Sequence, residues 1–206
     1  ETIIRLDQRV SDAEFHRVLA CSAKPGGDCK TPMIRWSRRR QGDMRIALAR
    51  IAPGYPEREA AIVDDAIDRA IAKINKAGSN IVMRRVAPAA KADINIFLLD
   101  VPQNSVLRGS RIRGMDGKNV AGAIASVWWN RDTKTINRGV IVIAPGHSPH
   151  TYKSIVLEEL FQSLGLLTDI LGVPYETSTI TAQNENMRLS LGRQDIAALN
   201  IHYPPK

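Results

Sequence analysis

Ser154-Ile-Val-Leu-Glu158-Glu159-Leu-Phe-Gln162-Ser-Leu-Gly165-Leu-Leu-Thr168-Asp169 is the most informative stretch of this 206-residue chain. Glu158 and Gln162 are four residues apart, so they project together from one side of a helix, with Glu159 beside them. The apolar residues of the stretch recur at helical spacing, which places the opposite side in a core; they are Leu157, Leu160, Phe161 and Leu164. The spacing therefore predicts a helix that presents a polar cluster from one face.

Zinc peptidases with a His-Glu-x-x-His helix use the same spacing, because two ligands one turn apart grip one ion while the adjacent Glu activates water. Overlaid on that pattern, Glu158 and Gln162 hold the ligand positions and Glu159 holds the position of the general base. Gly165 falls where metzincins turn the chain towards a third ligand, whose place Thr168 takes. Zinc prefers imidazole nitrogen and thiolate sulfur, so this set predicts no bound zinc and no cofactor.

Three interpretations of the polar cluster stay open at this point. The first is a hydrogen-bonded network that fixes the helix and the following turn. In the second, the oxygen donors Glu158, Gln162 and Asp169 hold a hard cation such as calcium. In the third, Glu159 is the catalytic base of an unusual hydrolase. His147 and His150 lie about two helical turns before Glu158, too far along the helix to share an ion with it unless the chain folds back.

The segment 157–169 resembles the signature of an uncharacterised bacterial family of zincin-like domains, domain of unknown function 2927. Two later segments, 191–195 and 203–205, echo that family's Leu-Thr-x-x-Asp and Tyr-x-Pro patterns, and Ile34-Arg-Trp36 resembles its opening strand. The chain departs from the family pattern at Thr168, where the family has Asn, and at Gly192, where it has Thr. The resemblance covers about residues 32–206, and it implies a zincin-like fold, a degenerate relationship to metzincin-type peptidases and an exported bacterial protein.

The rest of the sequence predicts an α+β fold with a mixed twisted sheet, covered on one face by two long helices, of which the second is the active-site-type helix. Residues 1–31 form a lead-in, and residues 32–206 form one zincin-like domain. The expected helices are 56–78 and 148–164, with a short one at 193–201. Residues 34–51 are expected to form a strand or a hairpin. Further strands are expected at 80–87 and 93–101, followed by a long loop at 102–120 and a hairpin of the strands 121–129 and 139–144.

The two cysteines, Cys21 and Cys29, flank a Pro-Gly-Gly turn that allows them to meet. A disulfide would favour an oxidising compartment, so we expect a periplasmic or secreted protein; two unpaired thiols in a loop are the alternative. No apolar run approaches the roughly 20 residues that span a bilayer. The sequence therefore predicts no transmembrane segment.

The net charge of +8 is unevenly distributed, because residues 1–118 hold 22 basic and 14 acidic residues. Arg35, Arg38, Arg39 and Arg40 concentrate this excess and predict a patch for an anionic partner; a solvated strand face and turn is the alternative. No nucleic-acid-binding fold signature is present and few aromatic residues interleave with the basic ones, which argues against nucleic acid as the partner.

Two functional hypotheses follow from these patterns. In the first, the chain is a non-catalytic pseudo-metallopeptidase, an exported binding or structural module that holds a peptide, a glycan or another partner of the bacterial envelope. In the second, it is a hydrolase of peptidase or amidase type that uses Glu159 as general base with an atypical metal or none.

Overall fold

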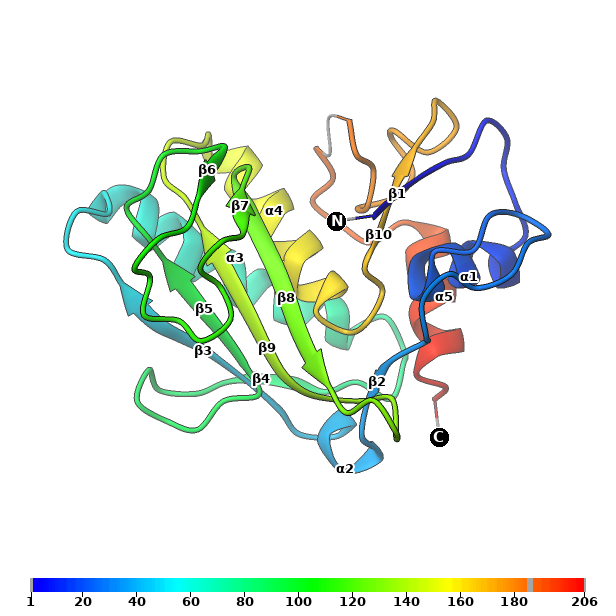
Figure 1. Cartoon of the computed structure of the whole chain (residues 1–206), viewed down its shortest axis with the longest axis horizontal. Coiled ribbons are helices and arrows are strands. Elements are labelled where there is room, and N and C mark those ends of the chain that lie inside the picture. The colour runs from blue at the N-terminus through cyan, green and yellow to red at the C-terminus, as the bar shows by residue number, and fades with distance from the viewer. Residues whose placement is uncertain (1, 185–186, 206) are drawn as a thin grey trace.

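The structure, a computed structural model, describes residues 2–184 and 187–205. Its main sheet has six strands (Figure 1). Five of them are parallel and follow the order β2, β9, β5, β3, β4, while β8 is antiparallel to β9. Their bounds are Arg35–Trp36 for β2, Met44–Ile51 for β3, Met83–Arg85 for β4, Ile94–Leu98 for β5, Ala123–Trp129 for β8 and Thr135–Ile143 for β9. The described chain is therefore a mixed α/β protein with a mostly parallel sheet.

Both faces of this sheet are covered, whereas the sequence pattern predicted cover on one face. Helices α3 (Glu57–Asn75) and α4 (Pro149–Gln162) pack behind it, against inward residues such as Ile141 and Ile143. The alternate residues Val140 and Val142 face the opposite way, where the segment 99–120 covers them. This segment contains the short paired strands β6 (Ser105–Val106) and β7 (Asn119–Val120). Burial on both faces explains why residues 139–143, the second half of β9, carry no polar side chain.

The hairpin predicted for residues 34–51 is wrong, because β2 and β3 pair with other strands. The short helix α2 (Arg38–Gln41) separates them. β2 lies parallel to the first residues of β9, and β3 lies between β5 and β4. Ile46 and Leu48 of β3 face Ile94 and Ile96 across the ladder, and all four are buried. The period of two predicted the strand correctly, but the buried parallel partner comes from a distant part of the sequence.

The N-terminal segment packs into the same hydrophobic cluster as the rest of the chain. Strand β1 (Thr2–Arg5) pairs in parallel with β10 (Thr168–Leu171), and α1 (Asp12–Cys21) packs against α5 (Arg193–His202). Phe15 of α1 is fully buried and stacks on Tyr175 with the ring centroids 5.5 Å apart. The chain start therefore lies beside the segment that follows α4, as Figure 1 shows.

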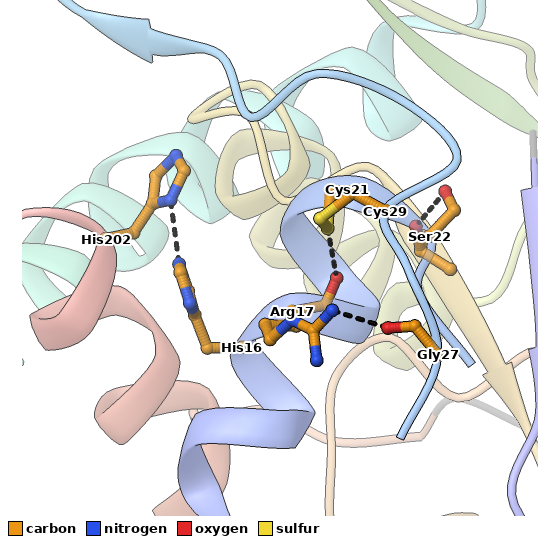
Figure 2. The surroundings of a disulfide bond; sticks show 8 residues. His16, Arg17, Cys21, Ser22, Gly27, Cys29 and His202 are labelled. Carbon is orange, nitrogen blue, oxygen red and sulfur yellow. Dashed lines mark hydrogen bonds between the residues drawn. A yellow bond between two sulfur atoms is a disulfide. The ribbon is translucent and has the colours of Figure 1, made fainter. Parts of the chain in front are cut away.

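The structure confirms the predicted disulfide at the end of α1. The Sγ atoms of Cys21 and Cys29 are 2.05 Å apart, and the bond closes the loop that carries Pro25, Gly26 and Gly27 (Figure 2). None of the described helices has the length and apolar character needed to cross a membrane.

Candidate functional site

Helix α4 carries the polar cluster, and local sequence sets where it begins and ends. Ser148 is its N-cap, because the Ser148 hydroxyl accepts a hydrogen bond from the backbone N–H of Thr151 at 3.1 Å, and Pro149 follows at the first helical position. The helix ends at Gln162, and Gly165 then turns the chain with a φ of 96°. The turn brings β10 back beside the last turn of α4.

Gln162 and Asp169 form a direct contact between α4 and β10. The side-chain Nε2 of Gln162 lies 2.6 Å from Oδ1 of Asp169, and both side chains are buried. A carboxylate only accepts hydrogen bonds, so the amide must turn its N–H group towards Asp169. At the position where a zinc peptidase has its second histidine, Gln162 therefore directs an amide donor at Asp169.

Thr168 does not lie at the polar cluster, although the zinc-peptidase overlay gave it the third-ligand position. Neighbouring residues on a strand point to opposite sides. The Thr168 hydroxyl therefore points the other way and lies 2.8 Å from the hydroxyl of Ser22, just after α1. Asp169, the next residue, takes the place facing Gln162 instead.

The polar cluster lines a hollow of about 160 Å³ between α4 and the start of β8. Glu159 is buried and Glu158 is half-buried, and both line this hollow together with Gln162 and Asp169. The structure thus brings together the four side chains that the helical spacing and the following turn had singled out. Three of them are carboxylates, so the hollow favours a cationic or hydrogen-bond-donating group.

These residues do not fit zinc. The described residues contain no group of three or more His, Cys, Asp or Glu side chains placed to hold a metal ion. The cluster itself offers neither imidazole nor thiolate, which zinc prefers, and the amide of Gln162 directs a donor at Asp169. The arrangement resembles a hydrogen-bonded network more closely than a ligand set.

His147 and His150 lie at the opposite end of α4 from Gln162 and contact other groups. The ring of His147 packs edge-on against Tyr152, with the centroids 5.2 Å apart. His150 contacts the backbone carbonyl of Met187, with Nε2 2.7 Å from that oxygen. Neither histidine lines the polar hollow.

The polar hollow continues into two others along β8. The second, of about 270 Å³, runs along residues 124–127 and shares Gln162 with the first. The third, of about 200 Å³, shares Thr2, Trp129 and Leu167 with the second and reaches Pro32. We call these three adjoining hollows the β8 groove.

One edge of β8 faces this groove without a strand partner. β8 pairs with β9 along its whole length, and no other described strand pairs with it. No backbone hydrogen bond joins its outer edge to another described segment. Side chains of Ala123, Ala125, Val127 and Trp129 pack towards the α4 side, so they form the floor of the groove beside that open edge.

A family model described as "Protein of unknown function (DUF2927)" matches residues 12–206. The chain is a DUF2927 protein. The match runs from the first residue of α1 to the end of the chain, so the DUF2927 domain includes the disulfide, the polar cluster and all of β8. It confirms the family resemblance read from residues 157–169. No curated protein matches the chain.

The four arginines predicted to form one patch do not all lie together in the DUF2927 domain. Arg35, Arg38 and Arg39 line one hollow of about 990 Å³ at the junction of β2, α2 and the end of α5. Arg40 points elsewhere, because its Nη1 lies 3.2 Å from the buried carboxylate of Asp93. An ion pair therefore neutralises Arg40, while the other three remain together.

His16 and His202, which were given no role from the sequence, are in direct contact in the fold. Nε2 of His16 lies 3.0 Å from Nδ1 of His202, and both rings are buried between α1 and α5 (Figure 2). Nε2 of His202 lies 2.9 Å from the carbonyl of Ile34. That carbonyl can only accept, so His202 carries its proton on Nε2 and accepts from His16 at Nδ1. No local pattern signals this contact, because the two residues are 186 positions apart.

Proposed function

We propose that this chain is a non-catalytic binding module that holds an extended peptide in the β8 groove. The observation that supports it is the open edge of β8, which runs beside adjoining hollows lined on their other side by residues of α4 and β10. An extended peptide can add to such an edge as a further strand, with its backbone bonded to β8 and its alternate side chains in the groove.

The chemistry of the groove favours a particular kind of peptide. Glu158, Glu159 and Asp169 line one end, where they would attract a lysine or arginine side chain. Towards Trp129 and Leu167 the groove is more apolar, which suits an aliphatic residue. The proposal is thus a peptide with a basic residue near one end and an apolar residue several positions away.

In this proposal the chain has the fold of a zincin-like peptidase that has lost its zinc chemistry. We also propose that the protein is exported to the bacterial envelope. The helix with Glu159 at the general-base position, followed by a glycine turn, supports the relationship. The disulfide between Cys21 and Cys29 is compatible with a location outside the cytoplasm. Hydrolysis of a peptide or amide by Glu159 is the second candidate, since this buried carboxylate borders the groove.

Binding to a random-sequence peptide library tests the proposal. Peptides selected on the purified chain should bind Ala125→Leu at least about tenfold more weakly, since the larger side chain fills the groove floor. Ala89→Leu, at an exposed position away from the groove, is the matched control and should bind as the wild type does. N-methylation of alternate peptide amides should reduce binding only for amides directed at β8.

Equal binding by both variants, or insensitivity to N-methylation in every register, would contradict the peptide-binding proposal. Mass spectrometry of the selected peptides after incubation separates the two candidates. Intact peptides agree with a binding module. Cleaved peptides, with cleavage lost in Glu159→Gln, would establish the hydrolase instead.

A further inference from the structure

Arg35, Arg38 and Arg39 lie at one hollow, and none of the three pairs with a described carboxylate. Several other arginines of the described chain pair with carboxylates, as Arg84 does with Asp43 at 2.5 Å and Arg193 with Asp12 at 2.8 Å. Within residues 2–184 and 187–205, no hydrogen bond or ion pair engages the side chains of Arg35, Arg38 or Arg39. Three positive charges thus lack a described counter-charge.

These three side chains border one hollow. It measures about 990 Å³, within the range of small-ligand sites, and is lined by residues of β2, α2, the turn between β8 and β9 and the end of α5. In Figure 1, β2 and α2 are at the lower edge of the molecule. No aspartate or glutamate is among its lining residues. The nearby carboxylate of Asp93 is already bound by Arg40 and Arg45. Met33, Pro204 and Pro205 add an apolar side to the hollow.

The positive charge at this hollow affects the pKa values of two buried histidines. His202 borders it, with His16 behind. Burial is the main reason that the pKa values of both histidines are low, and the charge of Arg35 lowers them further. The histidines therefore stay neutral at pH 7 and do not add to the charge, which comes from the three arginines and from Lys134.

We propose that this hollow binds a phosphate group on a larger ligand. Each guanidinium presents paired N–H donors that match the oxygens of a phosphate, and three of them suit a group that carries more oxygens and more charge than a single carboxylate. The apolar side formed by Met33, Pro204 and Pro205 can contact the carbon skeleton of the ligand. The site shares no lining residue with the β8 groove, so it does not depend on the peptide proposal.

Calorimetric titration and vesicle sedimentation test this proposal and separate the two sources of phosphate. The probes are glycerol 3-phosphate in solution, and vesicles of phosphatidylcholine with and without phosphatidylglycerol. The wild type should bind at least one phosphate probe. The triple variant Arg35→Gln, Arg38→Gln, Arg39→Gln should bind it at least about tenfold more weakly, and added salt should weaken wild-type binding.

The matched control has the same net charge but an intact hollow. Arg58→Gln, Lys91→Gln, Arg108→Gln removes three exposed charges elsewhere and should bind as the wild type does. Binding of glycerol 3-phosphate would assign a soluble phosphate ester, and binding of the anionic vesicles alone would assign a lipid headgroup. Equal loss in both triple variants, no binding of either probe, or equally tight binding of citrate would overturn the proposal.

A second readout does not depend on affinity. An anion in the hollow would offset the charge of Arg35, so the NMR titration midpoint of His16 should move to higher pH when a saturating phosphate probe is present. The arginine triple variant should show no such movement on addition of the probe. An unchanged midpoint in the wild type at saturation would contradict binding beside Arg35.

Discussion

Replacing Gly165 with alanine is expected to lower the free energy of unfolding by about 2–5 kcal/mol. Gly165 has a φ of 96°, a backbone conformation that residues other than glycine rarely adopt. A Cβ atom there would lie 2.3 Å from the backbone carbonyl oxygen of Ile34, and the side chains of Ile136 and His202 are also within 3.3 Å. Neither the carbonyl nor the helix end can move without disturbing β2 or α4.

Denaturant unfolding measures this effect, with Gly42→Ala as the control. Gly42 has a φ of −83°, and nothing lies within 4 Å of a Cβ built there, so its replacement should change stability by less than about 1 kcal/mol. Because the turn at Gly165 leads into β10, its replacement should also weaken peptide binding by moving Asp169 away from Gln162. Equal free energies of unfolding for the two variants would contradict the positive φ and the close contact with Ile34 at Gly165.

Acid is expected to destabilise the protein through the buried pair of His16 and His202. Burial, with a further effect of Arg35, lowers the pKa of His16 to about 4 and that of His202 to about 3. Since an unfolded histidine titrates near 6.5, the unfolded state binds more protons below that pH, and stability is lost as the pH falls from 6.5 towards 4. Each histidine contributes roughly 1.4 kcal/mol per pH unit across that interval.

The comparison that isolates this effect uses the double variant His16→Gln, His202→Gln, which keeps a donor and an acceptor at each position. Asp195 acts in the opposite direction, because burial raises its pKa to about 6, but it is present in both proteins and its effect cancels. The wild type should lose stability relative to the variant by up to about 2.7 kcal/mol per pH unit between pH 6 and 4. Parallel stability profiles would contradict the neutral, buried state of the pair.

Local signals predicted much of this fold. The N-cap Ser148 with Pro149 located the start of α4, and a period of 3.6 residues located α3. The Pro-Gly-Gly turn predicted the disulfide, which the structure confirms. These features succeed because the residues that determine each of them are neighbours in the sequence.

Pairing between distant segments could not be predicted in the same way. β1 pairs with β10 across more than 160 residues, and β2 pairs with β9 instead of forming a hairpin with β3. The alternation of apolar residues in β3 predicted that the strand has buried side chains. It did not predict which strands pair with β3. Parallel partners depend on packing of the whole sheet, which no short window of sequence contains.

At the candidate site, too, local spacing predicted some contacts and missed others. Helical spacing correctly grouped Glu158 with Gln162, and Asp169 joins them through the turn. It misplaced Thr168, because the overlay with zinc peptidases assumed a loop where the chain forms β10, whose alternation turns Thr168 towards Ser22. The β8 groove could not be predicted, since its lining residues come from several segments that are far apart in the sequence.

The metal content of the purified protein tests the central claim most directly. After exposure to zinc and dialysis against metal-free buffer, elemental analysis should find far less than one equivalent of zinc or of any other transition metal, with no change in Asp169→Ala. Close to one equivalent, lost in Asp169→Ala and accompanied by a peptidase activity that Glu159→Gln abolishes, would show instead that the chain is an active metallopeptidase.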